Sequence, residues 1–80
     1  MNNTIRVNCA KENLKLIREF VEEYLDNFDL SEIVLNQMIL AVDEICANLI
    51  IHSNKEDHTK FLTLRIDYQD NEFMFETKDS

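Results

Sequence analysis

The stretch Ala41-Val42-Asp43-Glu44-Ile45-Cys46-Ala47-Asn48-Leu49-Ile50-Ile51-His52-Ser53 decides how this chain folds. Its apolar residues recur at intervals of three and four, a pattern that predicts a helix with a buried face. Glu44, Asn48 and His52 stand four residues apart, so in a helix their side chains line one stripe. A carboxylate and a carboxamide one turn apart can hold a hard cation such as Mg²⁺ and orient a water molecule beside it.

The same helical pattern extends toward the N-terminus, and it predicts a helix from about Ser31 to His52. Asp29 followed by Glu32 fits a capping box, and Ser31 is an alternative N-cap. Apolar residues cover almost the whole circumference of this helix, so we expect it to be the central and best-buried one. Glu44 and Asn48 fall on one flank of the core-facing side of this helix, where the wall of a ligand-binding cleft would lie.

A strand and another helix are predicted ahead of this segment. Residues 4–7 alternate polar and apolar side chains, which indicates a short strand. Asn8 is a plausible N-cap for a helix from about Ala10 to Asn27. The apolar residues of that helix recur at helical spacing and predict one buried face; they are Leu14, Ile17, Val21, Tyr24, Leu25 and Phe28.

A polar loop over 53–60 separates the helices from a predicted hairpin, with strands at 61–69 and 72–78. Asp70-Asn71 favours a type I′ turn because both residues accept positive φ. That turn places Arg65 opposite Glu76 on one side and Leu62 opposite Asp79 on the other. On the side of Leu62 the register also pairs Tyr68 with Phe73, Ile66 with Phe75 and Leu64 with Thr77. The predicted class is therefore α+β, with two helices on one face of a mixed or antiparallel sheet.

Composition narrows the function classes. The chain has 80 residues, enough for one small domain, and contains neither Gly nor Pro, so Asn and Asp must make its turns. A net charge of −8 and a pI near 4.5 argue against nucleic acid as a partner. The sequence pattern shows neither a signal peptide nor a run of about 18 apolar residues, so we expect a cytoplasmic protein without a membrane span.

Each polar candidate, taken singly, also has an ordinary explanation. Glu44 could be a solvated helix carboxylate, and Asn48 a helix-flank amide bonded to nearby backbone. His52 is most simply a structural residue that favours the helix C-terminus and supports the loop after it. Cys46 fits a small buried hydrophobe, and its spacing to His52 and His58 matches no closed zinc site.

Taken jointly, these residues resemble the N-box of the histidine-kinase-like (GHKL) ATPases, in the branch of anti-sigma-factor serine kinases. The family pattern reads small-apolar-x-Glu-x-x-x-Asn-x-x-x-His, and residues 41–52 fill every position. Asp79-Ser80 resembles the first two residues of the Asp-x-Gly-x-Gly box of that family. The resemblance covers essentially all 80 residues in the family order of strand, helix, N-box helix and hairpin.

The resemblance implies a two-layer Bergerat-type ATPase fold that binds Mg·ATP between the helices and the sheet. It implies that Asn48 ligates Mg²⁺ at the phosphates and that Glu44 orients or deprotonates the attacking hydroxyl. Asp79 would accept a hydrogen bond from the adenine amino group. The implied partners are a sigma factor and an anti-anti-sigma factor that carries the phosphorylated Ser or Thr.

The glycine boxes and the ATP lid of the family have no counterpart in residues 1–80, so the resemblance implies the N-terminal part of such a domain. We expect this chain alone to be an inactive kinase, because Gly-rich backbone normally cradles the phosphates. One reading is therefore the first part of an ATP-dependent serine/threonine protein kinase that regulates a sigma factor. The alternative is a non-catalytic interaction or dimerisation module with the same fold, and in either case we expect a homodimer.

Overall fold

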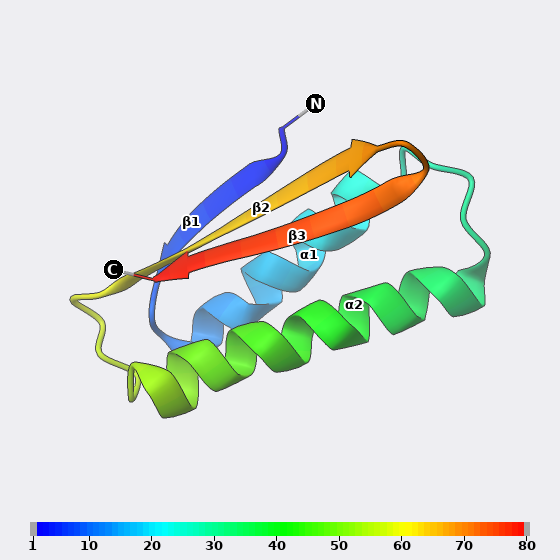
Figure 1. The fold of residues 1–80 in the computed structure, drawn as a ribbon. Helices are drawn as coiled ribbons and strands as arrows, with labels where there is room; N and C mark the ends of the chain where they lie inside the picture. The colour runs from blue at the N-terminus through cyan, green and yellow to red at the C-terminus, as the bar shows by residue number, and fades with distance from the viewer. Residues whose placement is uncertain (1, 80) are drawn as a thin grey trace.

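The protein is an α+β sandwich of two layers, as predicted (Figure 1). The computed structural model describes residues 2–79. In order, the elements are β1 (Thr4–Asn8), a 3₁₀ turn η1 (Lys11–Asn13), α1 (Leu14–Leu25), α2 (Glu32–Ala47), a π-helical segment η2 (Asn48–Ser53) that continues α2, β2 (Phe61–Gln69) and β3 (Glu72–Asp79).

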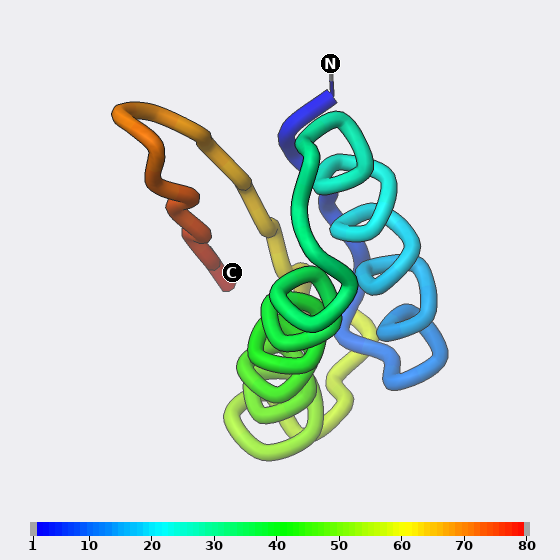
Figure 2. Tube along the Cα trace, turned by 90° about the vertical axis from the view of Figure 1, so that its right-hand side faces the viewer, coloured from blue at the N-terminus to red at the C-terminus, as the bar shows by residue number. Residues whose placement is uncertain are grey.

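The strands form one antiparallel sheet in the order β1-β2-β3. Both helices lie on the same face of this sheet, α1 toward the β1 edge and α2 toward the β3 edge (Figures 1 and 2). The central strand β2 contributes the deepest part of the core, with Leu62, Leu64 and Ile66 each at most 1% exposed. The helix-facing side chains of β2 alternate with outward polar ones, as a half-buried strand requires.

The predicted hairpin and its register are confirmed. Asp70 and Asn71 have φ of 55° and 64°, the positive values that a type I′ turn needs. Ile66 stands opposite Phe75, and Leu62 stands opposite Asp79. Since directly opposite residues of paired strands project to the same face, Asp79 lies on the helix-facing side with the buried Leu62.

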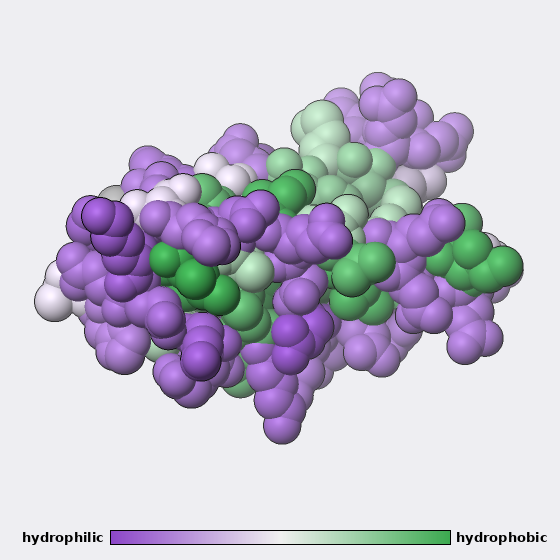
Figure 3. Space-filling view, turned by 90° about the horizontal axis from the view of Figure 1, so that it is seen from below, coloured by the Kyte–Doolittle hydropathy of each residue, from purple (hydrophilic) through white to green (hydrophobic). Residues whose placement is uncertain are grey.

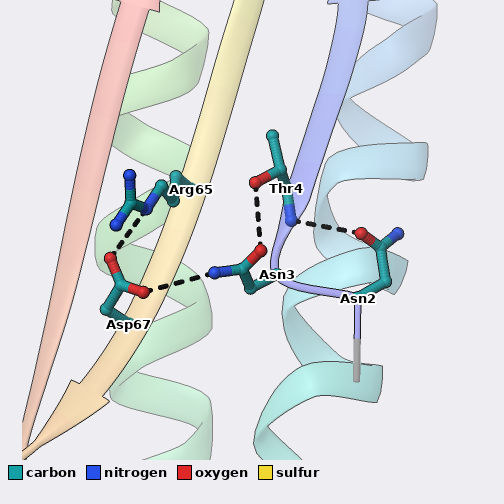
Figure 4. Close-up of polar contacts among 5 residues, drawn as sticks. All are labelled: Asn2, Asn3, Thr4, Arg65 and Asp67. Atoms are coloured by element: carbon teal, nitrogen blue, oxygen red, sulfur yellow. Dashed lines mark hydrogen bonds and ion pairs between the residues drawn. The ribbon is translucent and has the colours of Figure 1, made fainter.

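Arg65 and Glu76 lie opposite each other as predicted, but Arg65 pairs along its own strand instead. Its Nε donates to Oδ2 of Asp67 at 2.8 Å, and Nδ2 of Asn3 donates to Oδ1 of the same carboxylate at 3.2 Å (Figure 4). The backbone N–H of Ile66 also donates to the Asn3 carbonyl at 2.9 Å. These contacts attach the start of β1 to the centre of the sheet.

The first helix begins later than predicted, and Asn8 is not its N-cap. Asn8 ends β1, paired with Phe61, and the chain crosses to the helical layer only after it. Asn8 instead accepts from Nδ2 of Asn13, at 3.0 Å through its carbonyl and 2.6 Å through Oδ1. Sheet pairing at this position therefore replaced the predicted helix start.

The second helix is capped by Ser31, and the capping box with Asp29 is wrong. Ser31 has an extended backbone, and its Oγ accepts from the N–H of Val34 at 3.3 Å. The N–H of Leu30 donates to the carbonyl of Phe28 at 3.0 Å. This turn leaves Asp29 two positions too early to reach the first free N–H groups of the helix.

The prediction that the second helix is the best buried is also wrong. Helix α1 buries five residues, namely Ile17, Phe20, Val21, Tyr24 and Leu25, whereas α2 buries Val42 and Cys46. Leu40 and Ile45 of α2 are 60% and 50% exposed. The helix has the sheet on one side and α1 on another, and its remaining apolar surface appears as patches among charged side chains (Figure 3).

Contrary to the expectation from sequence, one segment, Glu32–Ser53, is long and apolar enough, by length and composition alone, to cross a membrane. A buried core helix of a soluble protein passes the same test, but only 17% of the 18-residue window is buried here. Here the segment packs in the helical layer against α1 and the sheet, in a compact molecule with a radius of gyration of 12.5 Å. A single globular domain of this length is expected to have about 12 Å.

An aromatic cluster closes the end of the sandwich at the hairpin turn. The ring of Phe28, just after α1, lies 4.6 Å from that of Tyr68 and 4.8 Å from that of Phe73. These distances suit favourable aromatic pairing. The C-terminal ends of α2 and β3 both lie at the opposite end of the sandwich (Figure 1).

Candidate functional site

The helix that carries the polar stripe changes its hydrogen bonding at Asn48. Here α2 ends at Ala47 and η2 continues in π geometry, so the α-helix predicted to reach His52 ends five residues early. The N–H of Asn54 closes the last wide turn by donating to the carbonyl of Leu49 at 3.0 Å, five residues back. Wide turns of this kind are rare and occur frequently at functional sites.

Glu44 and Asn48 lie one turn apart on the flank of α2 that faces away from α1. The N–H of Asn48 donates to the Glu44 carbonyl, which fixes this spacing. Asp43 points toward α1, where its Oδ1 accepts from Arg18 at 2.8 Å. At 100° per residue, the next positions along the helix turn away from that contact.

The side chains of Glu44 and Asn48 are both exposed. Within residues 2–79 neither makes a hydrogen bond, so the backbone-bonded amide considered for Asn48 is not what the structure shows. A carboxylate and an amide oxygen supply two ligands of the six that Mg²⁺ prefers. This pair therefore suits a cation whose other ligands are water and phosphate, and the described residues hold no cluster of three His, Cys, Asp or Glu for a metal.

Asp79 ends β3 beside the π-helical segment. Nδ2 of Asn54 donates to Oδ2 of Asp79 at 3.2 Å and to the carbonyl of Leu49 at 2.8 Å. This side chain therefore links the helix end that follows Asn48 to the strand end that carries Asp79. Among the described residues no hydrogen bond joins the side chains of Glu44, Asn48 and Asp79 to one another, and Ser80 lies outside those residues.

Asn54 is the residue that sequence analysis missed. His52 stands in the last turn of η2 as expected, but its side chain is exposed and makes no hydrogen bond within residues 2–79. The support of the following loop that was expected from His52 comes instead from Asn54, which is 7% exposed. An Asn directly after a helix in a loop without Gly was the available signal. The turn then passes through positive φ at Lys55 and Glu56, 51° and 53°, although such residues disfavour that region.

Buried thiols and one loop carboxylate have shifted pKa values. Burial, with smaller effects from Asp79 and Asp57, raises the pKa of Cys9. Burial and then the Asp43 carboxylate raise the pKa of Cys46 to about 11. Hydrogen bonds from the side chain and backbone of Thr59, at 2.6 and 3.0 Å, lower the pKa of Asp57. Both cysteines are neutral at physiological pH and unsuited to act as nucleophiles.

Two surface depressions occur elsewhere, along α1. One is lined by Asn2, Phe20, Glu23, Tyr24 and Asn27, and the other by Glu19, Glu22, Glu23 and Asp26. Neither includes a predicted site residue. The second is lined only by carboxylates, which would repel an anion such as a nucleotide phosphate.

Comparison with known proteins identifies the family of the chain. No curated protein matches the chain at a significant level. The model of the histidine kinase-like ATPase domain matches residues 7–80. This range runs from β1 through both helices and the hairpin to the position of Asp79, in the order that the sequence predicted. The chain therefore belongs to the histidine kinase-like ATPase family.

Proposed function

We propose that this chain is the N-terminal part of an ATP-dependent serine/threonine protein kinase of the anti-sigma-factor branch. Membership of the histidine kinase-like ATPase family implies nucleotide binding in general. The observation that carries the proposal is the Asn54 link between the π-helical turn and Asp79. This link supports the proposal because it joins the helical turn that follows Asn48 to the strand end that carries Asp79.

In this proposal Asn48 holds Mg²⁺ through its amide oxygen, and Asp79 accepts a hydrogen bond from the adenine amino group. Glu44, one turn before Asn48, orients the attacking hydroxyl of the protein substrate and takes its proton. ATP, when bound, supplies the phosphoryl group. The exposure of Glu44 and Asn48 supports these roles, because a ligand can reach both side chains without breaking a hydrogen bond to another residue of the chain.

The proposed partners are a sigma factor and an anti-anti-sigma factor, in the cytoplasm, with the kinase as a homodimer. The support is the resemblance of residues 41–52 to the N-box of that branch. The acidic surface also favours protein partners over nucleic acid, since a net charge of −8 repels phosphate backbones.

A non-catalytic interaction module is the second candidate. The observation that favours it is the apolar surface of α2, where Ile33, Leu40 and Ile45 are each at least half exposed. Apolar patches such as those in Figure 3 are typical of a surface that binds another protein when they are contiguous. The two candidates differ in one measurable property, because the interaction module needs neither nucleotide nor metal.

Calorimetric titration of Mg·ATP into the intact gene product tests the first candidate. Asn48→Ala should abolish binding, whereas Glu44→Ala should preserve binding and remove phosphoryl transfer to the protein substrate. Asn36→Ala, an exposed Asn on the same helix, is the matched control and should change neither property. Normal ATP affinity in Asn48→Ala would refute the metal assignment, and an intact protein without nucleotide affinity would favour the interaction module.

A further inference from the structure

Asn54 is the one buried polar side chain among residues 2–79, and its surroundings fix its orientation. Its backbone N–H and its Nδ2 both donate to the carbonyl of Leu49, at 3.0 and 2.8 Å. Its second amide hydrogen is directed to Oδ2 of Asp79 at 3.2 Å. Both partners can only accept hydrogen bonds, so the amide nitrogen must be the atom that faces them.

This contact constrains a carboxylate that would otherwise rotate freely at the end of a strand. Asp79 is exposed, and Asn54 is the only described residue with a side-chain hydrogen bond to it. With Oδ2 engaged, Oδ1 keeps its lone pairs for another donor. A carboxylate with one oxygen held and the other available is preorganised to accept a single hydrogen bond in a defined direction.

We propose that Asn54 is a positioning residue that orients Asp79 toward the amino group of the purine and thereby sets the preference for adenine over 6-oxopurine nucleotides. This inference rests on the proposed function, in which Asp79 contacts the base. A 6-oxopurine presents a carbonyl where adenine presents its amino group, so a fixed carboxylate would face another acceptor. Such a mismatch between two acceptors discriminates more strongly than a missing contact does.

The test compares Mg·ATP with Mg·ITP (the inosine analogue) by calorimetric titration of the intact gene product. Asn54→Ala should lower the preference for ATP over ITP by about threefold to tenfold, the worth of one hydrogen bond, while the affinity for ITP stays unchanged. Asp79→Ala should lower the same preference. In the double variant, Asn54→Ala should add nothing to Asp79→Ala, because both substitutions remove one interaction.

Asn27→Ala is the matched control. Nδ2 of Asn27 also donates to helix-end carbonyls, those of Glu23 and Tyr24 at 3.1 Å each, but it contacts no carboxylate. This variant should leave the nucleotide preference unchanged. Asn54→Asp provides a second test that keeps the shape of the side chain, removes the donor and places a like charge beside Asp79.

A second measurement uses neither nucleotide nor a substitution at Asn54, so misfolding of an Asn54 variant cannot affect it. It compares side-chain amide resonances of the wild-type protein and Asp79→Ala. The side-chain amide resonances of Asn54 should shift in Asp79→Ala, whereas those of Asn27 should not. Unmoved Asn54 resonances would overturn the inference. So would an equal loss of ATP and ITP affinity in Asn54→Ala, which indicates a purely structural role.

Two further outcomes separate this inference from the proposed function. If Asp79→Ala lowers the preference for ATP and Asn54→Ala does not, the positioning role is wrong and the contact of Asp79 with the base stands. If Asp79→Ala leaves the preference unchanged while ATP still binds, the contact with the base is wrong. The selectivity inference then fails with it.

Discussion

Cys46 and Asn54 show what single side chains contribute to this molecule. Cys46 was predicted to be a small buried hydrophobe, and it is fully buried. Helical periodicity was sufficient for this prediction, because burial on a helix depends on neighbours three and four residues away. The role of Asn54 could not be predicted in that way, since its carboxylate partner lies 25 residues further along the chain.

The raised pKa of Cys46 makes stability fall at alkaline pH. Its pKa is about 11 in the fold against an ordinary value of 9.0, so the folded state keeps a proton that the unfolded chain loses. This contribution to stability is complete below pH 9 and is lost as the pH rises toward 11. Urea unfolding near pH 10.5 should show a loss of about 2 kcal/mol relative to neutral pH.

Cys46→Val is the control for this prediction, because it fills the same space without a titrating group. The alkaline loss in the variant should be smaller by the same 2 kcal/mol or so. Identical pH profiles for the two proteins would show that the Cys46 thiol is not responsible.

The two helices differ in how well their sequences predicted their environment. The strands, the hairpin register and the existence of both helices followed from periodicity and from the turn residues Asp70 and Asn71. The limited burial of α2 could not be predicted from sequence. A helix that is apolar on all sides does not show which of its sides other elements cover. The π-helical segment was also missed, since its wide turns depend on the loop contacts of Asn54.

Substitutions on the buried face of α2 and η2 should lower the free energy of unfolding more than substitutions on the exposed face. Ile50 is fully buried in η2, so Ile50→Ala should lower the free energy of unfolding by about 3 kcal/mol, through lost transfer energy and a cavity. Leu40 is 60% exposed, and Leu40→Ala should change it by less than about 0.5 kcal/mol. Urea unfolding measures both; equal costs would mean that Leu40 is covered in solution.

Among residues 2–79 the sheet has two open edges, since β1 and β3 each pair only with β2 there. An unpaired edge is a template for another strand, and a second copy of the chain is the simplest source of one. We therefore predict self-association at high micromolar concentration, measured by sedimentation velocity. Met74→Lys adds a charge to β3 at a side chain that is 53% exposed, and it should weaken this association if β3 is the edge involved. A strictly monomeric wild-type protein would contradict the prediction.

The proposed nucleotide site lies at the end of the sandwich where Asn54 links the helix end to Asp79. Its most direct test is a titration of the intact gene product with Mg·ATP, followed by backbone amide resonances. We expect the largest shifts within 44–54 and 77–79 and little change along 19–26, the acidic face of α1. Shifts concentrated along α1, with residues 44–54 unmoved, would contradict it.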